Sequence, residues 1–189
     1  MVVGLGNPGP DYRDTRHNAG FWFLDRWAGI LGLSFRKPWF RPFSFVSTVK
    51  DGHRLVLVKP LTFINHSGRI LPELFSRFDA SEVDLVVVFD QMDLPPGRLR
   101  MKPHGTAAGH NGLKSIDEVV AGRYHRIAVG IGRPAPGVGV IDHVLGPPSS
   151  SARAAVDSVM DKVVPAVNEL WPRGWEPLIR AVNQRDLPS

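Results

Sequence analysis

"VDLVVVFD", residues 83–90, is an almost uninterrupted apolar run that ends in a carboxylate. A strand that is apolar on both of its faces is typical of the centre of a parallel sheet, because helices cover such a sheet on both sides. Asp90 ends this strand, and the carboxyl ends of strands are where an α/β sheet commonly binds its ligands. The segment therefore predicts an α/β fold with a site at the end of this strand.

Shorter elements alternate along the rest of the chain. Strands are predicted at Val2-Val3, 43–49, 54–60, 97–102 and 125–132, and helices at 19–32, 67–78, 112–121, 149–170 and 171–183. Asp51-Gly52 is a strong hairpin signal, Ser67 is a candidate helix cap, and residues 136–140 are typical of a flexible loop. We expect a single α/β domain over residues 1–189, a twisted mixed β-sheet covered by helices on both faces (an α/β/α sandwich).

Composition restricts the classes of partner and chemistry. Lys and Arg outnumber Asp and Glu by 23 to 18, which favours anionic partners such as nucleic acid, although a solvated basic surface explains the charge equally well. The absence of cysteine excludes disulfides, thiolate zinc sites and cysteine nucleophiles. No apolar run approaches the roughly 20 residues of a membrane span, so we expect a cytoplasmic protein with no membrane partner.

Residues 4–9, "GLGNPG", have the G-x-G-x-x-G spacing of a dinucleotide-binding turn. In that fold the third glycine lies in the first turn of a helix, whereas prolines on both sides of Gly9 favour a rigid loop. The acidic residue expected about 20 positions later would be Asp25, which lies within a helical pattern and not at the end of a strand. We therefore reject a dinucleotide site and expect the glycines to turn the backbone around Asn7.

Polar side chains recur beside glycine, proline or buried strands in four segments. These segments are Asn7 with residues 15–18, residues 59–68 around Asn65, residues 89–97 beginning at Asp90, and residues 107–113 around His110-Asn111. Each alone is more simply explained as a turn former or a structural histidine. Together they supply a histidine–carboxylate pair that can activate water and asparagines that can stabilise an oxyanion. Without a G-x-S-x-G motif or cysteine, attack by water is favoured over a covalent enzyme intermediate.

A metal site is the competing chemistry for the same region. Its candidate ligands are Asp90, Asp93, His104 and His110. No H-E-x-x-H or H-x-H pattern supports it, and residues 93–96 are typical of a turn. We expect neither a metal nor a cofactor.

Four motifs occur in the order and spacing of bacterial-type peptidyl-tRNA hydrolase: GLGNPGPDYRDTRHNAG, KPLTFINHSG, DQMDLPPGRLR and GHNGLKSI. VGIGRP and HVLG also resemble that family, so the similarity covers essentially the whole chain. The resemblance implies an enzyme that cleaves the ester between a peptide, or an N-blocked amino acid, and tRNA. Such an enzyme recycles tRNA from aborted translation, a form of ribosome rescue, and needs no metal or cofactor.

The resemblance also implies individual roles. His17 is implied as the general base, Asp90 as the carboxylate that keeps it basic, and Asn7 as the residue that distinguishes blocked from free aminoacyl-tRNA. The remaining implied contacts to the tRNA acceptor end come from Tyr12, Phe63, Asn65, His110 and Asn111. Asn65 and Asn111 would also position the ester or the water. We expect the protein to act as a monomer.

The basic residues are less clearly assigned. Lys102 is implied to face the tRNA 5′-phosphate, but a second cation expected near the GIG strand is replaced by Ala128, which leaves Arg123 or Arg126 as possible substitutes. A basic strip that could follow the phosphate backbone comprises Arg98, Arg100, Lys102, Lys114 and Arg133. The alternative function is an RNA-binding relative that has lost its chemistry. The complete set of His17, Asp90, Asn65 and Asn111 favours the enzyme over this alternative.

Overall fold

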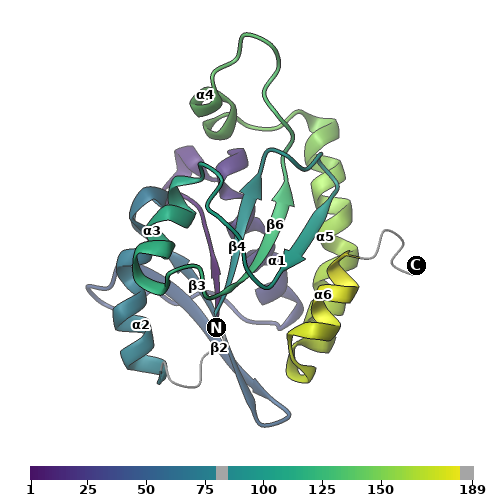
Figure 1. The fold of residues 1–189 in the computed structure, drawn as a ribbon. Helices are drawn as coiled ribbons and strands as arrows, with labels where there is room; N and C mark the ends of the chain where they lie inside the picture. Colours follow the sequence, from purple (N-terminus) through teal and green to yellow (C-terminus); the bar gives the residue numbers. More distant parts are fainter. Residues whose placement is uncertain (80–84, 184–189) are drawn as a thin grey trace.

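The computed structural model describes residues 1–79 and 85–183 and contains a six-stranded sheet (Figure 1). The strand order is β2-β3-β1-β4-β6-β5. The bounds are β1 (Val2–Gly4), β2 (Phe43–Lys50), β3 (His53–Pro60), β4 (Val86–Gln91), β5 (Leu99–Lys102) and β6 (His125–Gly130). The four central strands are parallel and the two edge strands antiparallel, so the predicted mixed sheet is confirmed.

Strand β4 lies in the interior, as its apolar sequence predicts. Val86 and Val88 join the hydrophobic cluster on one face of the sheet, whereas Val87 and Phe89 join the cluster on the other face. Because successive side chains of a strand point to opposite faces, a strand covered on both sides has to be apolar throughout. The first two residues of the quoted segment, 83 and 84, lie outside the described residues.

Helices cover both faces of the sheet (Figure 1). One face packs against α1 (Ala19–Ile30), α5 (Ser150–Leu170) and α6 (Trp175–Asn183). The other packs against α2 (Leu71–Phe78) and α3 (Asn111–Val120). The α/β/α architecture expected from the sequence is therefore confirmed. None of the described helices has the length and apolar character that a membrane span requires.

The β2–β3 hairpin forms where Asp51-Gly52 predicts it. Asp51 has φ 52° and Gly52 has φ 78°, and the paired register runs from Phe43↔Pro60 to Lys50↔His53. Two consecutive positive φ angles are typical of the tight turn whose twist matches that of the strands it joins. The hairpin brings β2 to the edge of the sheet next to β3.

Two local expectations are wrong. Ser67 does not cap a helix; it lies buried inside a 3-10 helix (Ile64–Ile70), where its hydroxyl donates to the carbonyl of Ile64. The α-helix starts later, at Leu71, which places Pro72 in its first turn, where the amide hydrogen that proline lacks would have no partner within the helix. Residues 136–140 are not entirely loop either, since Val140 begins a short helix, α4 (Val140–Leu145).

The glycines of the opening motif also differ from expectation. Only Gly9 of the three has a positive φ, 106°, and turns the chain. Gly4 and Gly6 are instead required by close packing, because added Cβ atoms would lie 2.6 Å from the carbonyl of Gly20 and 2.8 Å from the ring of Phe21. Helix α1 therefore crosses directly over the end of β1.

This close crossing predicts a strong difference between two glycines of α1. A Cβ at Gly20 would lie 2.5 Å from backbone atoms of Leu5 and Val88, whereas one at Gly29 meets nothing within 4 Å. We expect Gly20→Ala to lower the free energy of unfolding by about 1–3 kcal/mol through overpacking. Gly29→Ala is the matched control and is expected to be neutral or to stabilise by up to about 1 kcal/mol. Urea unfolding measures both, and equal midpoints would contradict the close crossing.

Candidate functional site

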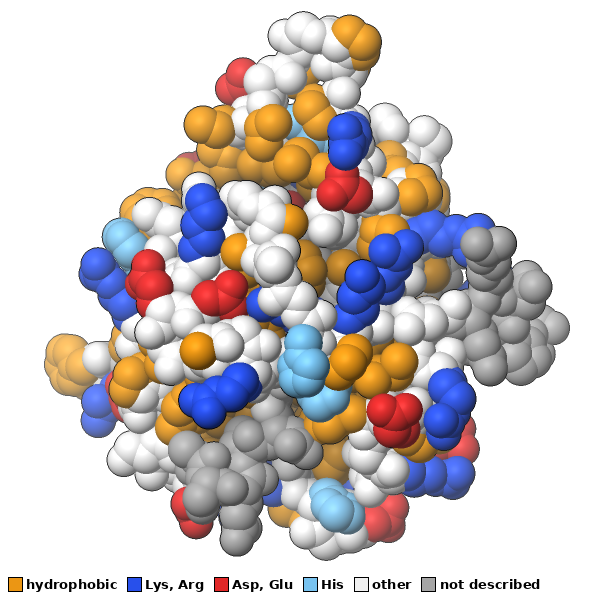
Figure 2. All heavy atoms as spheres, viewed as in Figure 1, with side chains coloured by type: hydrophobic (Ala, Val, Ile, Leu, Met, Phe, Trp, Pro, Cys, Tyr) orange, Lys and Arg blue, Asp and Glu red, His pale blue; other side chains and the backbone are white. Residues whose placement is uncertain are grey.

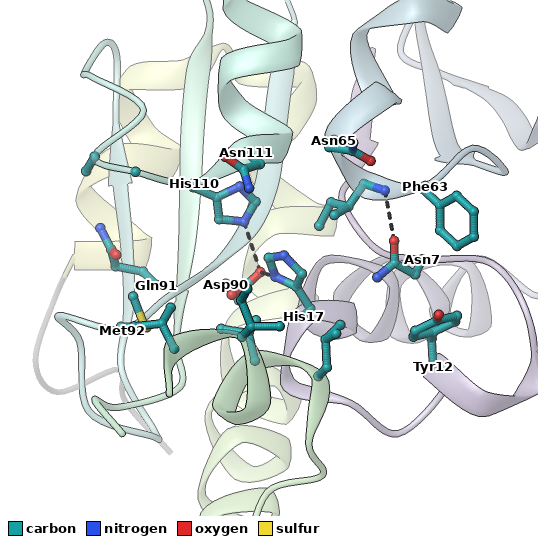
Figure 3. Close-up of a pocket in the computed structure, with 17 residues that line it drawn as sticks. Asn7, Tyr12, His17, Phe63, Asn65, Asp90, Gln91, Met92, His110 and Asn111 are labelled. Carbon is teal, nitrogen blue, oxygen red and sulfur yellow. Dashed lines mark hydrogen bonds and ion pairs between the residues drawn. The ribbon is translucent and has the colours of Figure 1, made fainter. Parts of the chain in front are cut away.

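A pocket of about 360 Å³ lies beyond the carboxyl ends of the central strands (Figure 3). Its walls come from segments that are far apart in the sequence: the chain after β1, the 3-10 helix after β3, the end of β4, the start of α3, and α4. The lining residues predicted from the sequence are Asn7, Tyr12, His17, Phe63, Asn65, Asp90, His110 and Asn111. Parallel strands bring these ends together because their carboxyl termini lie at the same edge of the sheet.

Two histidines converge on one carboxylate oxygen at the base of this pocket (Figure 3). Nδ1 of His17 lies 2.7 Å from Oδ1 of Asp90, and Nε2 of His110 lies 3.0 Å from the same oxygen. Asp90 is 3% exposed at the end of β4, so water does not compete for these contacts. The sequence predicted the pairing of His17 with Asp90 but not the second histidine on the same atom.

The hydrogen-bond partners assign the protons of both rings. The backbone N–H of Leu113 donates to Nδ1 of His110 at 3.2 Å, so the ring proton of His110 is on Nε2 and is donated to Asp90. His17 likewise donates from Nδ1 to the carboxylate, which leaves its Nε2 unprotonated when the ring is neutral. The basic nitrogen of His17 is thus the one not occupied by Asp90.

Asp90 stays ionised at neutral pH. Burial alone would raise the pKa of Asp90, but the nearby His110 and His17, through charge and hydrogen bonds, more than offset this and hold the pKa well below its usual range. A carboxylate that accepts hydrogen bonds from two donors is stabilised in its charged form. The site therefore contains a fixed negative charge beneath His17.

Asn7 and Asn18 join the opening loop to the rest of the pocket. Asn18 accepts the N–H of Asn7 at 2.8 Å and donates to the carbonyl of Asn7 at 3.0 Å. Oδ1 of Asn7 in turn accepts the N–H of Ile64 at 2.8 Å, so its Nδ2 is the part left for the pocket. Asn18 is 2% exposed and was not among the predicted site residues; its signal in the sequence was its place directly after His17.

The remaining predicted contacts lie at the rim. Asn65 and Asn111 are exposed, and Oδ1 of Asn111 accepts from Lys114 at 3.3 Å. The rings of Tyr12 and Phe63 meet edge to face, with centroids 6.3 Å apart, and Phe63 is 58% exposed. The pocket therefore has a buried charged base and an open rim of amide and aromatic groups.

Lys102 lies outside this pocket. It lines a second cavity of about 280 Å³ with Arg100, His104 and Arg126, and the two cavities share Gln91 and Ala108. Lys and Arg side chains gather around β5 in this part of the surface (Figure 2). Two residues of the basic strip, Arg100 and Lys102, thus lie next to the pocket and not within it.

Of the two arginines considered as substitutes for the residue at Ala128, Arg126 lines the second cavity and Arg123 does not. Arg126 donates to the carbonyl of Thr106 at 2.6 Å and to Asp117 at 3.0 Å, while its buried Nε has no partner among the described residues. Its charge is therefore partly balanced within the protein. Arg133, another residue of the strip, is paired with Asp93.

The outer wall of the pocket was missed from the sequence. Val140, Ile141, Val144 and Leu145 of α4 line it, and the top of the molecule in Figure 2 shows the apolar surface that they form part of. Arg16 holds α4 in place by donating to the carbonyls of His143 at 2.8 Å and Gly146 at 3.1 Å. A six-residue helix has too few turns for a periodic pattern to indicate it.

Among the described residues, His17, Asp90 and His110 form a group whose ligand atoms all lie within 4.8 Å of one another. Both imidazole nitrogens that face Asp90 carry the protons that hydrogen-bond it, so a metal ion would first have to displace them. Of the other ligands considered, Asp93 and His104 line the second cavity instead. Nδ1 of His17, Nε2 of His110 and Oδ1 of Asp90 thus already have hydrogen-bond partners in one another.

The fold and the site together define an α/β protein with a histidine–carboxylate site in an open pocket at the carboxyl edge of its sheet. A family model described as peptidyl-tRNA hydrolase matches residues 1–189. The chain belongs to the peptidyl-tRNA hydrolase family.

Individual relatives agree with this assignment. The chain is 42% identical to a peptidyl-tRNA hydrolase of Symbiobacterium thermophilum over 169 residues, 88% of this chain and 89% of the relative. It is 41% identical to one from Geotalea daltonii, covering 99% and 97% of the two chains. The crystal structure of peptidyl-tRNA hydrolase from Acinetobacter baumannii superposes with a TM-score of 0.88 at 30% identity, covering 99% of this chain and 95% of that one.

The ionised Asp90 predicts a pH-dependent contribution to stability. Because its folded-state pKa lies below the unfolded value of about 3.9, the contribution is complete above that value and is lost as the pH falls through the folded pKa. We expect Asp90→Asn to be less stable than the wild type at pH 7 by about 1.5–3 kcal/mol, the worth of a hydrogen bond to a charged group.

Denaturant unfolding at pH 7, 5 and 3 measures this difference, which should be smaller at pH 3 than at pH 5. Asp93→Asn is the control, because its side chain is 57% exposed and its ion pair with Arg133 is expected to contribute less than about 1 kcal/mol. A difference for Asp90→Asn that grows towards pH 3 would contradict the assigned charge.

Proposed function

We propose that this protein hydrolyses the ester that joins a peptide, or an N-blocked amino acid, to the 3′ end of tRNA, and so recycles tRNA from aborted translation. The observation that carries the proposal is the 2.7 Å contact between Nδ1 of His17 and Oδ1 of Asp90, which leaves the basic Nε2 available at an open pocket. The names of the relatives support the same activity. The runner-up function, RNA binding without chemistry, would not require this contact between His17 and Asp90.

In the proposed reaction, Nε2 of His17 takes a proton from water as the water oxygen attacks the ester carbonyl carbon. Asp90 stabilises the imidazolium that forms and keeps the ring oriented. The tetrahedral intermediate then expels the ribose oxygen of the tRNA, which takes the proton back from His17. The products are a carboxylic acid, which ionises to the carboxylate and releases one proton to the solvent, and a tRNA with a 3′ hydroxyl; atoms and charge then balance without a cofactor.

The oxyanion needs donors that are already in place. Asn65 and Asn111 lie at the rim and supply amide N–H groups, and Asn111 is also the first residue of α3. The first amides of a helix have no partner inside the helix, and the helix dipole favours negative charge there. We assign oxyanion and water positioning to this rim, with His110 as the residue that orients Asp90.

Asn7 is proposed to distinguish blocked from free aminoacyl-tRNA. Its Oδ1 is occupied by the N–H of Ile64, so only its Nδ2 donor is available to the substrate. A donor at this point pairs with the carbonyl of a peptide or acyl group, whereas a free ammonium would present only further donors. Tyr12 and Phe63 supply aromatic faces for the terminal base of the tRNA.

The second cavity is proposed to receive a phosphate of the tRNA acceptor end. Lys102 and Arg100 are its exposed cations, and Arg126 adds a buried one beside Ala128. We further propose that residues 1–189 act as one domain, a cytoplasmic monomer that uses neither metal nor cofactor.

Release of the blocked amino acid from N-acetyl-aminoacyl-tRNA in excess EDTA tests the activity. We expect His17→Ala to lower kcat by about 10²–10⁴ with little change in KM, because a general base contributes to the transition state and not to tRNA binding. His53→Ala is the matched control, since His53 begins β3 at the opposite end of the sheet. Unchanged turnover of His17→Ala would remove the residue from the base role, and no turnover by the wild type would favour the RNA-binding alternative.

The phosphate assignment predicts a change in salt dependence. Lys102→Ala should weaken tRNA binding, and the slope of log Kd against log salt should fall by about 0.7–0.9, the value for one lost phosphate contact. Arg54→Ala removes the same charge at the far end of the sheet and is expected to leave the slope unchanged. Filter binding between low and physiological salt measures both slopes, and equal slopes would argue against a phosphate at Lys102.

A further inference from the structure

An aromatic pair projects from the segment before β2 without packing against the protein. Trp39 is 87% exposed and Phe40 is 96% exposed, and their ring centroids lie 6.2 Å apart at 66°. Large aromatic side chains bury much of their area in most proteins and are rarely left in water singly or in pairs. The pair is therefore a feature that folding alone does not explain.

The backbone at this tip, residues 38–42, is held in an unfavourable conformation. The N–H of Arg41 donates to the carbonyl of Pro38 at 3.3 Å and closes a turn in which Phe40 has φ 59°. Glycine or asparagine is preferred at such a position, and a bulky residue there is uncommon. The chain thus retains an exposed phenyl ring where a glycine would fit the turn better, and prolines at 38 and 42 restrict the backbone on either side.

The charged residues in the segment that carries the tip, residues 36–41, are all cations. Arg36, Lys37 and Arg41 are exposed, and Arg41 pairs with Glu73 of α2 at 3.2 Å. Neither Arg36 nor Lys37 has an ion-pair partner within the described part of the chain. Exposed aromatic rings interleaved with unpaired cations match a polyanion that carries flat, stackable groups.

The tip lies at the same edge of the sheet as the pocket. Phe43 at the start of β2 pairs with Pro60 at the end of β3, and the N–H of Leu61 donates to the carbonyl of Pro42 at 2.7 Å. Phe63 of the pocket rim follows two residues later. The chain from Phe40 to Pro42 and the chain from Leu61 to Phe63 each span at most about 7 Å. The backbones of Phe40 and Phe63 therefore lie within about 20 Å of one another. Apolar side chains beside Lys and Arg project from the left edge of Figure 2, on the side of the molecule where β2 begins and β3 ends in Figure 1.

We propose that Trp39 and Phe40 form an accessory RNA-binding tip that stacks on bases of the tRNA substrate outside the pocket, with Arg36 and Lys37 facing the adjoining phosphates. The inference rests on the proposed function, because that function places tRNA at this edge of the sheet. Aromatic stacking is tolerant of sequence, since every base has a π-face. The tip would thus add affinity for tRNA of any sequence without contacting the ester.

A protein partner and a lipid surface fit the tip less well. Two aromatic side chains bury at most about 500 Å² together on this chain, less than the roughly 800 Å² that each partner buries in a standard protein interface. A lipid surface would match the charge, but nothing else in the proposed activity brings a membrane to this edge. RNA supplies phosphates for the cations and bases for the aromatic rings, and the proposed function places it at this edge of the sheet.

Kinetics on two substrates test the tip. The first is N-acetyl-aminoacyl-tRNA, and the second is the N-acetyl-aminoacyl ester of adenosine alone, which is too short to reach from the pocket to the tip. We expect Trp39→Ala and Phe40→Gly each to raise KM for the tRNA substrate about 5- to 100-fold, the range for one lost stack, with unchanged kcat. Neither substitution should change kcat/KM for the adenosine ester.

Phe40→Gly separates binding from folding. Glycine relieves the positive φ, so thermal unfolding should show this variant to be at least as stable as the wild type while its KM for tRNA rises. Val49→Ala, which truncates a 62% exposed side chain near the opposite end of β2, is the control and should leave both substrates unaffected. Loss of stability in Phe40→Gly together with weaker turnover of both substrates would overturn the proposal in favour of a structural role.

Tryptophan fluorescence gives a readout that does not depend on activity. Trp39 is exposed, whereas Trp22, Trp27 and Trp171 are buried and Trp175 is partly buried against the core, so deacylated tRNA should quench the wild type strongly and Trp39→Ala weakly. Equal quenching of the two, or a response to phosphatidylserine vesicles with none to tRNA, would overturn the RNA assignment. If the wild type hydrolyses neither substrate, the proposed function fails, and the quenching experiment still decides whether the tip binds RNA.

Discussion

The arrangement of the site depends on one buried carboxylate that accepts hydrogen bonds from two imidazoles on a single oxygen. Asp90 can occupy this position because β4 is an interior strand of the sheet and Asp90 lies near its carboxyl end. The neighbouring segments then bring His17 and His110 to the same oxygen, one from the 3-10 helix that precedes α1 and the other from the start of α3. Removing the charge would leave His17 without the partner that fixes its tautomer, and His110 with only the N–H of Leu113.

A second network makes the opening loop part of the same assembly. Asn18 follows His17 directly and binds both backbone groups of Asn7, and Asn7 holds the N–H of Ile64. Under the proposed mechanism, the residue that selects the blocked substrate and the residue that activates water are therefore joined through one buried asparagine. A shift of this loop would therefore displace Asn7 and His17 together, although ten positions of sequence separate them.

The sequence predicted the sheet, its hairpin and most helices because each rests on a local pattern: a doubly apolar strand, an Asp-Gly turn, and helical periodicity in residues 19–32 and 149–170. It failed where the cause was tertiary. Gly4 and Gly6 look like turn glycines, but the close approach of α1 requires them, and no local pattern carries that contact. Similarly, α4 is too short for periodicity, and the position of Lys102 in a separate cavity depends on how β5 pairs with β6.

The central claim is that His17 presents an unprotonated Nε2 to the pocket, with the proton on Nδ1 held by Asp90. The most direct measurement is the set of imidazole ¹⁵N chemical shifts in the full-length protein, recorded where the rings are neutral and assigned with His17 and His110 variants. We predict a protonated Nδ1 with an unprotonated Nε2 for His17, and the opposite tautomer for His110. A His17 ring protonated on Nε2 under these conditions would contradict the account, because Nε2 would then have no lone pair to accept a proton from water.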